Sequence, residues 1–314
     1  MSFERDQIKH RAANLAAQGV YLGTSSWKYE GWLGQLYTPA RYEFRGKVAR
    51  KRFEQCCLAE YAEVFKTVCV DAAYYNFPNE RYLEGLVAQV PGDFRFSFKV
   101  TDAITIRKYP NLNRFGERAG KINEHFLNAD LFTTAFLKPM SDFREQIGLL
   151  IFEFSKFYSS DYARGSIFVE DLDRFLGALP RGWPYGIELR NQHWLQSEYF
   201  QCLARHQVAH IFNSWDGMPA VTDQLSLPDS RPHPGLVGAR FLLKPGRKHA
   251  DAVKAFAPYD RVKDQYPEAR SAGRALIKQG IEAKGHQQTY IYVNNRLEGN
   301  ALGTLAAMAV ESTG

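Results

Sequence analysis

The sequence predicts an α/β protein with the architecture of a (β/α)8 TIM barrel. Eight short apolar segments have the composition of buried strands, and each is followed by a segment of helical spacing or by a loop. A doubly wound open sheet is the competing architecture, but the first strand is not followed by the GxGxxG loop of dinucleotide-binding folds. The length of 314 residues, 45% of them hydrophobic, fits one large domain or two ordinary ones, and the unbroken alternation favours one.

The expected elements follow from local pattern. Residues 94–99 show the clearest alternation, with three phenylalanines on one face and Arg95, Ser97 and Lys99 on the other. Asn79 is the expected N-cap of a helix ending at Val87. The eight expected strands are residues 20–25, 67–72, 94–99, 148–154, 185–190, 208–213, 238–243 and 289–294. Helical spacing appears at 47–65, 170–179, 198–206, within 253–281 and after 298.

The expected domain organisation is a helical extension over residues 1–19, followed by a single barrel domain over residues 20–314. The region around 101–139 is longer than a strand-to-strand connection requires, so we interpret it as an insertion near a site, with a helix at about 118–126.

Charge and cysteine content limit the function class. The net charge of +6, from 40 basic and 34 acidic residues without a long basic run, weakly favours anionic ligands and makes a nucleic-acid-binding protein unlikely. The four cysteines have neither CxxC nor metal-ligand spacing, so we expect buried, reduced thiols in a cytoplasmic protein. No apolar run approaches about 20 residues and the first 20 residues are polar, so neither a membrane span nor secretion is indicated.

The strand at 185–190 carries a carboxylate and a guanidinium within an apolar run. Alternate side chains of a strand share a face, so Glu188 and Arg190 point one way while Ile187 and Leu189 point the other. Charges are rarely buried without partners. The chain therefore either pairs these two charges as a structural ion pair or uses them.

Other polar residues fall at the expected carboxyl ends of strands, where TIM barrels place their working groups. With Glu188 and Arg190, these residues are Thr24, Asp71, Lys99, Glu153, Asn213, Asn294 and Asn295, with Arg240 deeper on its strand. We expect Asp71, Glu153 and Glu188 to line one cavity opposite Lys99, Arg190 and Arg240, so that its depth is neutral.

Glu188 is the expected acid or base, because a carboxylate in a dry barrel mouth can exchange protons near neutral pH. Glu153 lies on the neighbouring strand and could form a carboxylate pair with it, as in glycoside hydrolysis. Lys99 and Arg190 complete the catalytic set; alternatively, they neutralise both acids and leave a structural network. A near-neutral pKa of Glu188 would favour an enzyme, and a Glu188 closed in a salt bridge with Arg190 would favour binding or structure.

Aromatic and basic residues complete the expected ligand site. Trp27, Tyr75 and Trp215 are candidate ligand contacts, although such residues are as often core beneath loops. Lys244, Arg247 and Lys248 follow the seventh strand, where barrels often bind phosphate, and would give the mouth a positive rim. The three acids could hold a hard cation, but we expect neither a metal nor an organic cofactor.

Four groups of motifs resemble the YecE-like proteins, a family of unknown function whose fold is a TIM barrel. They span residues 20 to 310 in the family's order: residues 21–27 with Tyr29, Trp32, Tyr37 and Pro39; 94–99 with Ile104 and Thr105; 186–190 with Trp194; and 293–295 with Glu298, Gly299 and Ala301. The resemblance supports the barrel but implies no established reaction. The positions at which this chain most safely matches the site residues of the family are Thr24, Trp27, Lys99, Glu188, Arg190, Arg240, Asn294 and Asn295.

The sequence also departs from the family pattern. Cys69, Asp71 and Ala73 stand where the family's second strand usually carries Glu, Asn and Thr. Glu153 replaces an expected glutamine, Ile106 replaces a histidine, and residues 240–243 read Arg-Phe-Leu-Leu in place of Arg-Leu-His-Gly. We therefore expect the ligand or the protonation of this site to differ from the rest of the family.

These observations lead to two functional hypotheses. The first is a hydrolase- or isomerase-type enzyme that acts on a small polar or anionic metabolite, bearing a sugar or a phosphate, by carboxylate acid/base chemistry. The second is a non-catalytic protein that binds a small molecule, or nucleic acid, in the same pocket. The sequence leaves the oligomeric state open.

Overall fold

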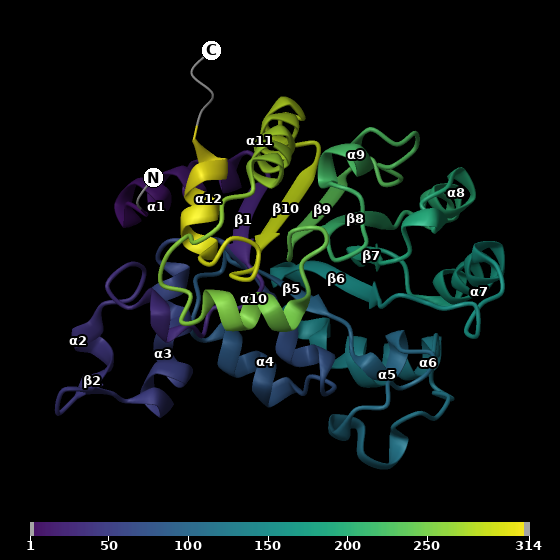
Figure 1. Cartoon of the computed structure of the whole chain (residues 1–314), viewed down its shortest axis with the longest axis horizontal. Helices are drawn as coiled ribbons and strands as arrows, with labels where there is room; N and C mark the ends of the chain where they lie inside the picture. Colours follow the sequence, from purple (N-terminus) through teal and green to yellow (C-terminus); the bar gives the residue numbers. More distant parts are fainter. Residues whose placement is uncertain (1–2, 311–314) are drawn as a thin grey trace.

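The computed structural model describes residues 3–310 and has the predicted (β/α)8 architecture (Figure 1). Eight strands form one sheet in the order β1-β10-β9-β8-β7-β6-β5-β4, and the neighbouring strands pair in parallel. The strands are β1 (Val20–Thr24), β4 (Thr67–Val70), β5 (Arg95–Lys99), β6 (Ile147–Phe154), β7 (Tyr185–Leu189), β8 (Ala209–Ser214), β9 (Leu236–Phe241) and β10 (Gln288–Val293). Each lies within about two residues of its predicted span.

The two edge strands, β1 and β4, meet without a regular hydrogen-bonded ladder between their described residues. The Tyr61 hydroxyl bridges them, because it accepts from the Thr24 N–H and donates to the Thr67 carbonyl, at 3.0 Å each. The backbones approach closely at Gly23, where an added Cβ would lie 2.3 Å from the Thr67 oxygen. The barrel is thus closed by a side chain and a close contact at this seam.

Helices surround the strands (Figure 1). They are α1 (Arg5–Ala17), α2 (Pro39–Tyr42), α3 (Arg50–Ala62), α4 (Glu80–Val87), α5 (Asp102–Thr105), α6 (Ala129–Leu131), α7 (Gly165–Ala178), α8 (Ser197–Arg205), α9 (Val221–Leu225), α10 (His249–Phe256), α11 (Pro267–Glu282) and α12 (Ala301–Ala309). The predicted cap is present, since Asn79 accepts from the Tyr82 N–H at 2.9 Å. None of the helices within residues 3–310 is both long and apolar enough to cross a membrane.

One helix prediction was wrong in part and another was wrong altogether. The segment expected to be helical from residue 47 begins with strand β3 (Lys47–Val48), which pairs with β2 (Glu43–Phe44), and the helix starts only at Arg50. The helix expected at about 118–126 is absent. The insertion instead contains a 3-10 helix, η3 (Asn113–Arg118), and turns at Gly116 and Gly120, whose positive φ angles interrupt a helix.

The first two residues of the expected extension and the last four of the expected barrel, 311–314, lie outside the described residues. Within the described part, α1 precedes β1 and packs beside α12. The insertion continues through α6 and two irregular helices, η4 (Phe132–Leu137) and η5 (Lys138–Gln146), to the start of β6.

The barrel interior is filled below the level of the predicted site. Tyr290 and Tyr292 stack with ring centroids 6.4 Å apart, and Ile211 lies against both Gly186 and Gly238, where an added Cβ would be 2.5 Å from its Cδ1. The two glycines therefore provide the space that one isoleucine fills. The remaining apolar residues of this interior layer are Cys69, Leu149, Ile151, Ala209 and Leu236. This packing closes the middle of the barrel, so the site predicted at the carboxyl ends of the strands has an apolar floor.

Candidate functional site

Two carboxylates lie side by side on neighbouring strands at the carboxyl end of the barrel. Glu153 on β6 and Glu188 on β7 are direct partners in the parallel register, and both are buried. Two adjacent buried anions repel each other unless cations separate them. Lys99 from β5, Arg240 from β9 and Arg190, directly after β7, supply those cations.

Glu188 is held by two arginines. Arg190 donates from Nε and Nη2 to Glu188 Oε1 at 3.0 and 2.9 Å, and Arg240 Nη1 donates to Glu188 Oε2 at 2.6 Å. The Glu188 side chain is 0% exposed, whereas Arg190 is 8% and Arg240 3% exposed. Both carboxylate oxygens are therefore occupied by charge-assisted hydrogen bonds. This closed arrangement is the one that favours binding or structure over proton transfer by Glu188.

Glu153 shares the same cations. Its Oε2 lies 2.5 Å from Lys99 Nζ, 2.8 Å from Arg190 Nη2 and 3.4 Å from Arg240 Nη1. Burial by itself would raise the pKa of Glu153, but Arg190, Lys99 and Arg240 together lower it to about 2. Glu153 is thus ionised throughout the neutral range and serves as the common anion of the network.

Asp71 is the most open of the three acids. It begins the 3-10 helix η2 (Asp71–Tyr74) directly after β4, and its Oδ1 lies 3.2 Å from Arg240 Nη2. The side chain is 34% exposed, and this exposure is to a cavity that it lines. Burial raises the pKa of Asp71, while Arg240 and Lys99 lower it, and the net shift is upward. The three acids and three cations balance, as predicted, so the base of the site is neutral.

The cavity above this network has a volume of about 230 Å3. It is lined by Asp71, Glu153, Lys99, Arg190 and Arg240 of the network and, around them, by Tyr74, Tyr75, Arg114, Ser155, Trp215, Leu242, His249, Asn294 and Arg296. Glu188 lies behind this wall and does not line it. The structure therefore brings most of the predicted site residues together, with the central one beneath the others.

Two aromatic rings hold cations at the cavity wall. The Lys99 ammonium lies 3.5 Å from the centroid of the Tyr74 ring, and the Arg190 guanidinium lies 3.7 Å from that of Trp215. Such cation–π contacts position a charge without neutralising it. Tyr75 lies at the rim with 57% of its surface exposed.

Arg114, His249 and Arg296 line the cavity but were not among the predicted site residues. In the part of the chain that the structure describes, neither Arg114 nor Arg296 forms an ion pair with a carboxylate. Partial burial and the charges of Arg296 and Arg190 lower the pKa of His249 below its usual value, so this ring is neutral at pH 7. The two arginines therefore give the cavity mouth a net positive charge.

The positive rim was predicted from the wrong residues. Lys244 is 40% exposed and lies 3.9 Å from Asp264, and Arg247 forms an ion pair with Asp264 and donates to the Leu297 carbonyl. Neither side chain lines the cavity. A sequence signal for Arg296 existed, since it directly follows the asparagine pair at the end of the last strand; Arg114 sits in the insertion, whose fold the sequence did not indicate.

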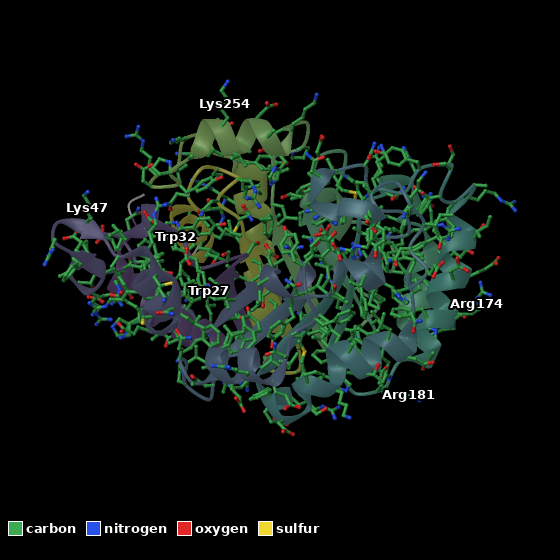
Figure 2. The ribbon with its side chains drawn as sticks, turned by 90° about the horizontal axis from the view of Figure 1, so that it is seen from below. Trp27, Trp32, Lys47, Arg174, Arg181 and Lys254 are labelled. Atoms are coloured by element: carbon green, nitrogen blue, oxygen red, sulfur yellow. The ribbon has the colours of Figure 1, made fainter. Side chains whose placement is uncertain are left out.

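Four other predicted ligand contacts are absent from the cavity wall. Thr24 faces the helical layer and contacts Tyr61, and Asn213 is buried and donates to the Leu189 carbonyl. Asn295 accepts from the Ala301 N–H at the start of α12. Trp27 is 5% exposed, and Figure 2 shows it with Trp32 inside the molecule, whereas Lys47 and Arg181 lie at its edge. These four residues are buried in the protein around the cavity and do not contact the space inside it.

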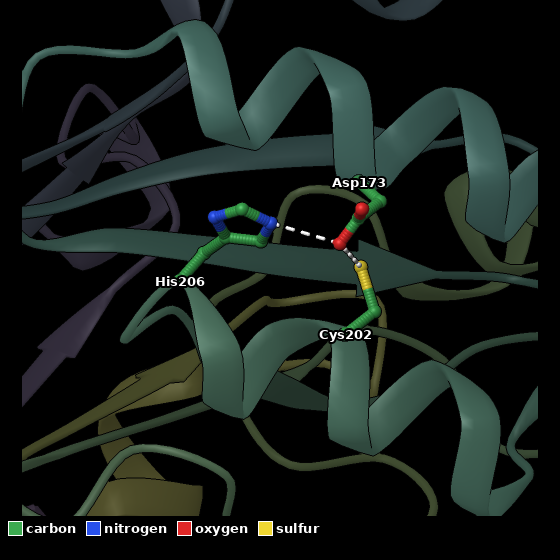
Figure 3. Close-up of side chains that lie close together, drawn as sticks. All are labelled: Asp173, Cys202 and His206. Carbon is green, nitrogen blue, oxygen red and sulfur yellow. Dashed lines mark hydrogen bonds and ion pairs between the residues drawn. The ribbon is translucent and has the colours of Figure 1, made fainter.

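One cluster of potential metal ligands occurs among residues 3–310 (Figure 3), and none of its residues lines the cavity. Asp173 on α7 lies close to Cys202 and His206 at the end of α8. The Asp173 Oδ1 already accepts from His206 Nε2 at 2.9 Å and from Arg205 Nη2 at 2.8 Å. These contacts join two outer helices.

Of the four cysteines, none is in a disulfide and Cys56 is exposed, contrary to the expectation that all are buried.

The profile of a protein family, described as "Protein of unknown function DUF72", matches residues 21–313. The chain belongs to the DUF72 family. This is the YecE-like family that the sequence motifs resembled, so the predicted membership is confirmed. No curated protein matches the chain significantly.

Solved structures of DUF72 proteins share the fold. A DUF72 family protein from Enterococcus faecalis V583 is 20% identical, with a TM-score of 0.61 over 92% of this chain and 94% of that chain. A second crystal structure from the same organism gives 18% identity and a TM-score of 0.58, covering 92% and 95%. A DUF72 family protein from Thermotoga maritima MSB8 is 17% identical, with a TM-score of 0.56 and coverage of 92% and 97%. At these identities the likeness extends to the barrel alone.

Proposed function

We propose that this DUF72 protein is an enzyme that binds an anionic group, a phosphate or a carboxylate of a small metabolite, in the cavity at the carboxyl end of its barrel. The observation that carries this proposal is the pair Arg114 and Arg296. Both guanidinium groups line the cavity, and within residues 3–310 neither is paired with a carboxylate. Guanidinium groups match carboxylate and phosphate oxygens in geometry as well as in charge.

The neutral base below these two arginines supports the same assignment. The network cations are already neutralised by Asp71, Glu153 and Glu188, so they add no excess charge. A ligand would therefore meet a neutral floor and a positive mouth. The volume of about 230 Å3 is below the range of about 300–1,000 Å3 that is usual for drug-sized ligands, so the cavity suits a small ligand or one end of a longer one.

Asp71 is the acid/base group of the proposed reaction. It is the most exposed acid of the network, it faces the cavity, and its pKa is shifted upward, toward the range in which a carboxylic acid can give and take protons. Glu188, the group expected from the sequence, instead holds Arg190 and Arg240 in place. A hydrolase- or isomerase-type reaction with one mobile proton fits this arrangement.

The second candidate function is non-catalytic binding in the same cavity. The burial of Glu188 favours non-catalytic binding. Glu188 was the acid or base predicted from the sequence, yet it is fully buried and does not line the cavity, so a ligand cannot reach it. Under this alternative Asp71 would only help to orient the ligand.

The test is a thermal-shift screen of phosphate esters, sugar phosphates and sugar acids against neutral polyols. A ligand at about 100 times its dissociation constant adds about 2.7 kcal/mol of stability, which raises the melting temperature measurably. We expect the anions to raise it in the parent protein and in the control Arg181→Met, but much less in Arg296→Met. Stabilisation by neutral polyols alone would disprove the anion site.

Each compound that binds is then incubated with the protein, and its conversion is followed by chromatography. We expect Asp71→Asn to keep binding but to lose turnover by at least about a hundredfold, as when a general acid or base is removed. Equal turnover in the parent and in Asp71→Asn would exclude Asp71 as the acid or base, and turnover in neither protein would favour the non-catalytic alternative. We also propose a cytoplasmic location, because all four cysteines are free and a reducing compartment preserves thiols.

A further inference from the structure

A second, larger depression opens directly from the cavity. It has a volume of about 930 Å3 and lies between residues 105–121 of the insertion and residues 155–161, which follow β6. We call it the insertion groove. It shares Tyr74, Arg114, Ser155, Arg190 and Trp215 with the cavity wall, so the two form one continuous space.

The insertion groove is strongly basic. Its lining contains six cations and a single acid, Asp161, and the cations are Arg107, Lys108, Arg114, Lys121, Lys156 and Arg190. Asp161 is already engaged, because its carboxylate accepts from the Tyr158 N–H. Only Arg107 and Arg190 have a carboxylate within ion-pair distance in the part of the chain described here. Four cations of the insertion groove therefore have no carboxylate partner at ion-pair distance among the described residues. The net charge of the whole chain is +6, so these four are a large share of its excess positive charge.

Aromatic rings are exposed along the same path. Tyr158 in the insertion groove is 64% exposed, and Tyr75 at the adjoining cavity rim is 57% exposed. The Trp215 ring lies at the junction, against Arg190. Exposed rings that adjoin one another and are rimmed by charged residues are typical of a binding surface. Cations interleaved with exposed aromatic rings are the surface that binds a phosphate chain bearing planar bases.

We propose that the insertion groove and the cavity together bind a short single-stranded oligonucleotide, with its terminal phosphate in the cavity. The backbone would follow Lys108, Lys121 and Lys156, and bases would stack on Tyr158 and Tyr75. A single strand is required, because the bases of a duplex are already stacked on each other. The inference rests on the proposed anion site, for which it names the substrate class.

The sequence led to the opposite expectation, that nucleic acid was an unlikely ligand. The reason is that a net charge is an average over the chain. The groove cations come from separated positions, and the fold brings the four in the insertion beside Lys156 and Arg190, which follow β6 and β7.

The test measures fluorescence anisotropy of labelled oligothymidylates from about two to about ten nucleotides long, each with and without a terminal phosphate. We expect affinity to rise with length until the groove is filled, at about four nucleotides, and then to level off. Lys108→Glu/Lys121→Glu should weaken binding by at least about tenfold and lower the salt slope by about 1.4, for two phosphate contacts on a single strand. The matched control Lys9→Glu/Lys278→Glu, with the same charge change at exposed lysines of α1 and α11, should stay within about twofold of the parent.

Three further measurements separate base recognition from general charge. Tyr158→Leu should weaken the oligonucleotide by about fivefold or more and leave inorganic polyphosphate unaffected, because stacking contributes about 1–3 kcal/mol per base. Equal affinity for polyphosphate and oligonucleotide, or tighter binding of duplex than of single strand, would overturn the proposal. Loss of the terminal-phosphate preference in Arg296→Met would support placement of that phosphate in the cavity.

The failure of this inference is distinguishable from failure of the proposed function. If sugar phosphates bind in an Arg296-dependent manner and oligonucleotides do not, the groove inference is wrong and the small-anion site stands. If oligonucleotides bind with no preference for a terminal phosphate and no small anion binds, the cavity has no part in recognition and both proposals are wrong.

Discussion

Arg190 and Arg240 at the base of the cavity differ from Arg114 and Arg296 at its mouth in what their guanidinium groups touch. Each of the two basal arginines contacts at least two carboxylates, and both are less than a tenth exposed. Within residues 3–310 the two upper arginines contact no carboxylate at ion-pair distance, although they line the same cavity. Four residues of one type thus have two different electrostatic surroundings only a few side chains apart.

The difference separates charges that belong to the fold from charges that are free for a ligand. A buried cation with two anionic partners stabilises the barrel only as part of the whole network, and removing it leaves the partners unpaired. A solvated cation at the mouth contributes little to stability and can exchange its water for a ligand. Burial and partners, rather than residue type, therefore identify the candidate binding groups.

The largest expected effect on stability comes from removing a cation of the ion-pair network at the bottom of the cavity. Arg240→Met removes a cation that contacts Glu188, Glu153 and Asp71, and we expect it to lower the free energy of unfolding by about 3–5 kcal/mol. Urea denaturation at pH 7 measures the loss. Arg296→Met is the matched control and should change stability by no more than about 0.5 kcal/mol.

A compensating change sharpens this result. Adding Glu188→Leu to Arg240→Met also removes the acid that has lost one of its two arginine partners, and should recover part of the lost stability. Equal destabilisation by Arg240→Met and Arg296→Met would mean that the arginines at the bottom and at the mouth of the cavity contribute alike to stability.

The pH dependence of stability gives the next largest effect. The pKa of Glu153 is lowered to about 2 in the folded protein, from 4.5, so its ionised form stabilises the fold above the unfolded pKa. This contribution, on the order of 3 kcal/mol, should be lost as the pH falls from about 4.5 to about 2. Urea midpoints measured across that range should fall in the parent protein and fall less in Glu153→Gln. Parallel curves for the two proteins would contradict the assignment.

The mouth arginines should have a smaller effect, on binding rather than on stability. Arg114→Met and Arg296→Met should each weaken an anionic ligand by about tenfold, equivalent to about 1.4 kcal/mol, since each removes one charge-assisted contact. Titration calorimetry with a phosphate ester identified in the thermal-shift screen measures this change. A similar loss in Arg181→Met would show that the effect is one of net charge and not of the cavity.

The smallest effect is expected at Asp71, with the opposite sign. Its folded pKa is raised, so its contribution to stability is greatest at low pH and decreases as the pH rises through the folded pKa. At pH 7 the ionised form is therefore slightly unfavourable, and Asp71→Asn should be as stable as the parent or more stable by up to about 1 kcal/mol. Thermal denaturation at pH 7 provides the measurement. A clear loss of stability in Asp71→Asn would mean that Asp71 belongs to the ion-pair network that stabilises the fold.

The alternation of residue types was sufficient to predict the barrel and the base of its site. Glu188 and Arg190 were expected on one face of a strand because side chains of a strand alternate, and the two are indeed paired. The neutral balance of three acids and three cations followed from applying the same reasoning to the other strands. The charges at the carboxyl ends of the strands were therefore accessible from the sequence.

The mouth of the cavity was not predicted, because it depends on how loops fold over the strands. Lys244 and Arg247 follow a strand directly, yet both are turned toward Asp264. Arg114 lines the cavity from the insertion, which turns at Gly116 and Gly120 instead of forming the expected helix. Trp27 and Asn295 occupy motif positions of the family, but the Trp27 ring is buried and the Asn295 side chain accepts from the Ala301 N–H at the start of α12. Strand periodicity contains none of this information.

The seam between β1 and β4 has a consequence for how the molecule fluctuates. Elsewhere around the barrel each strand is joined to its neighbours by parallel pairing, whereas here a single tyrosine hydroxyl bridges the two edges. Transient opening of the cylinder therefore requires the fewest broken bonds at Tyr61. Amide protons of β1 and β4 that face this seam should exchange with solvent deuterium before those of β7, which is paired on both sides, and the barrel should begin to unroll at this line.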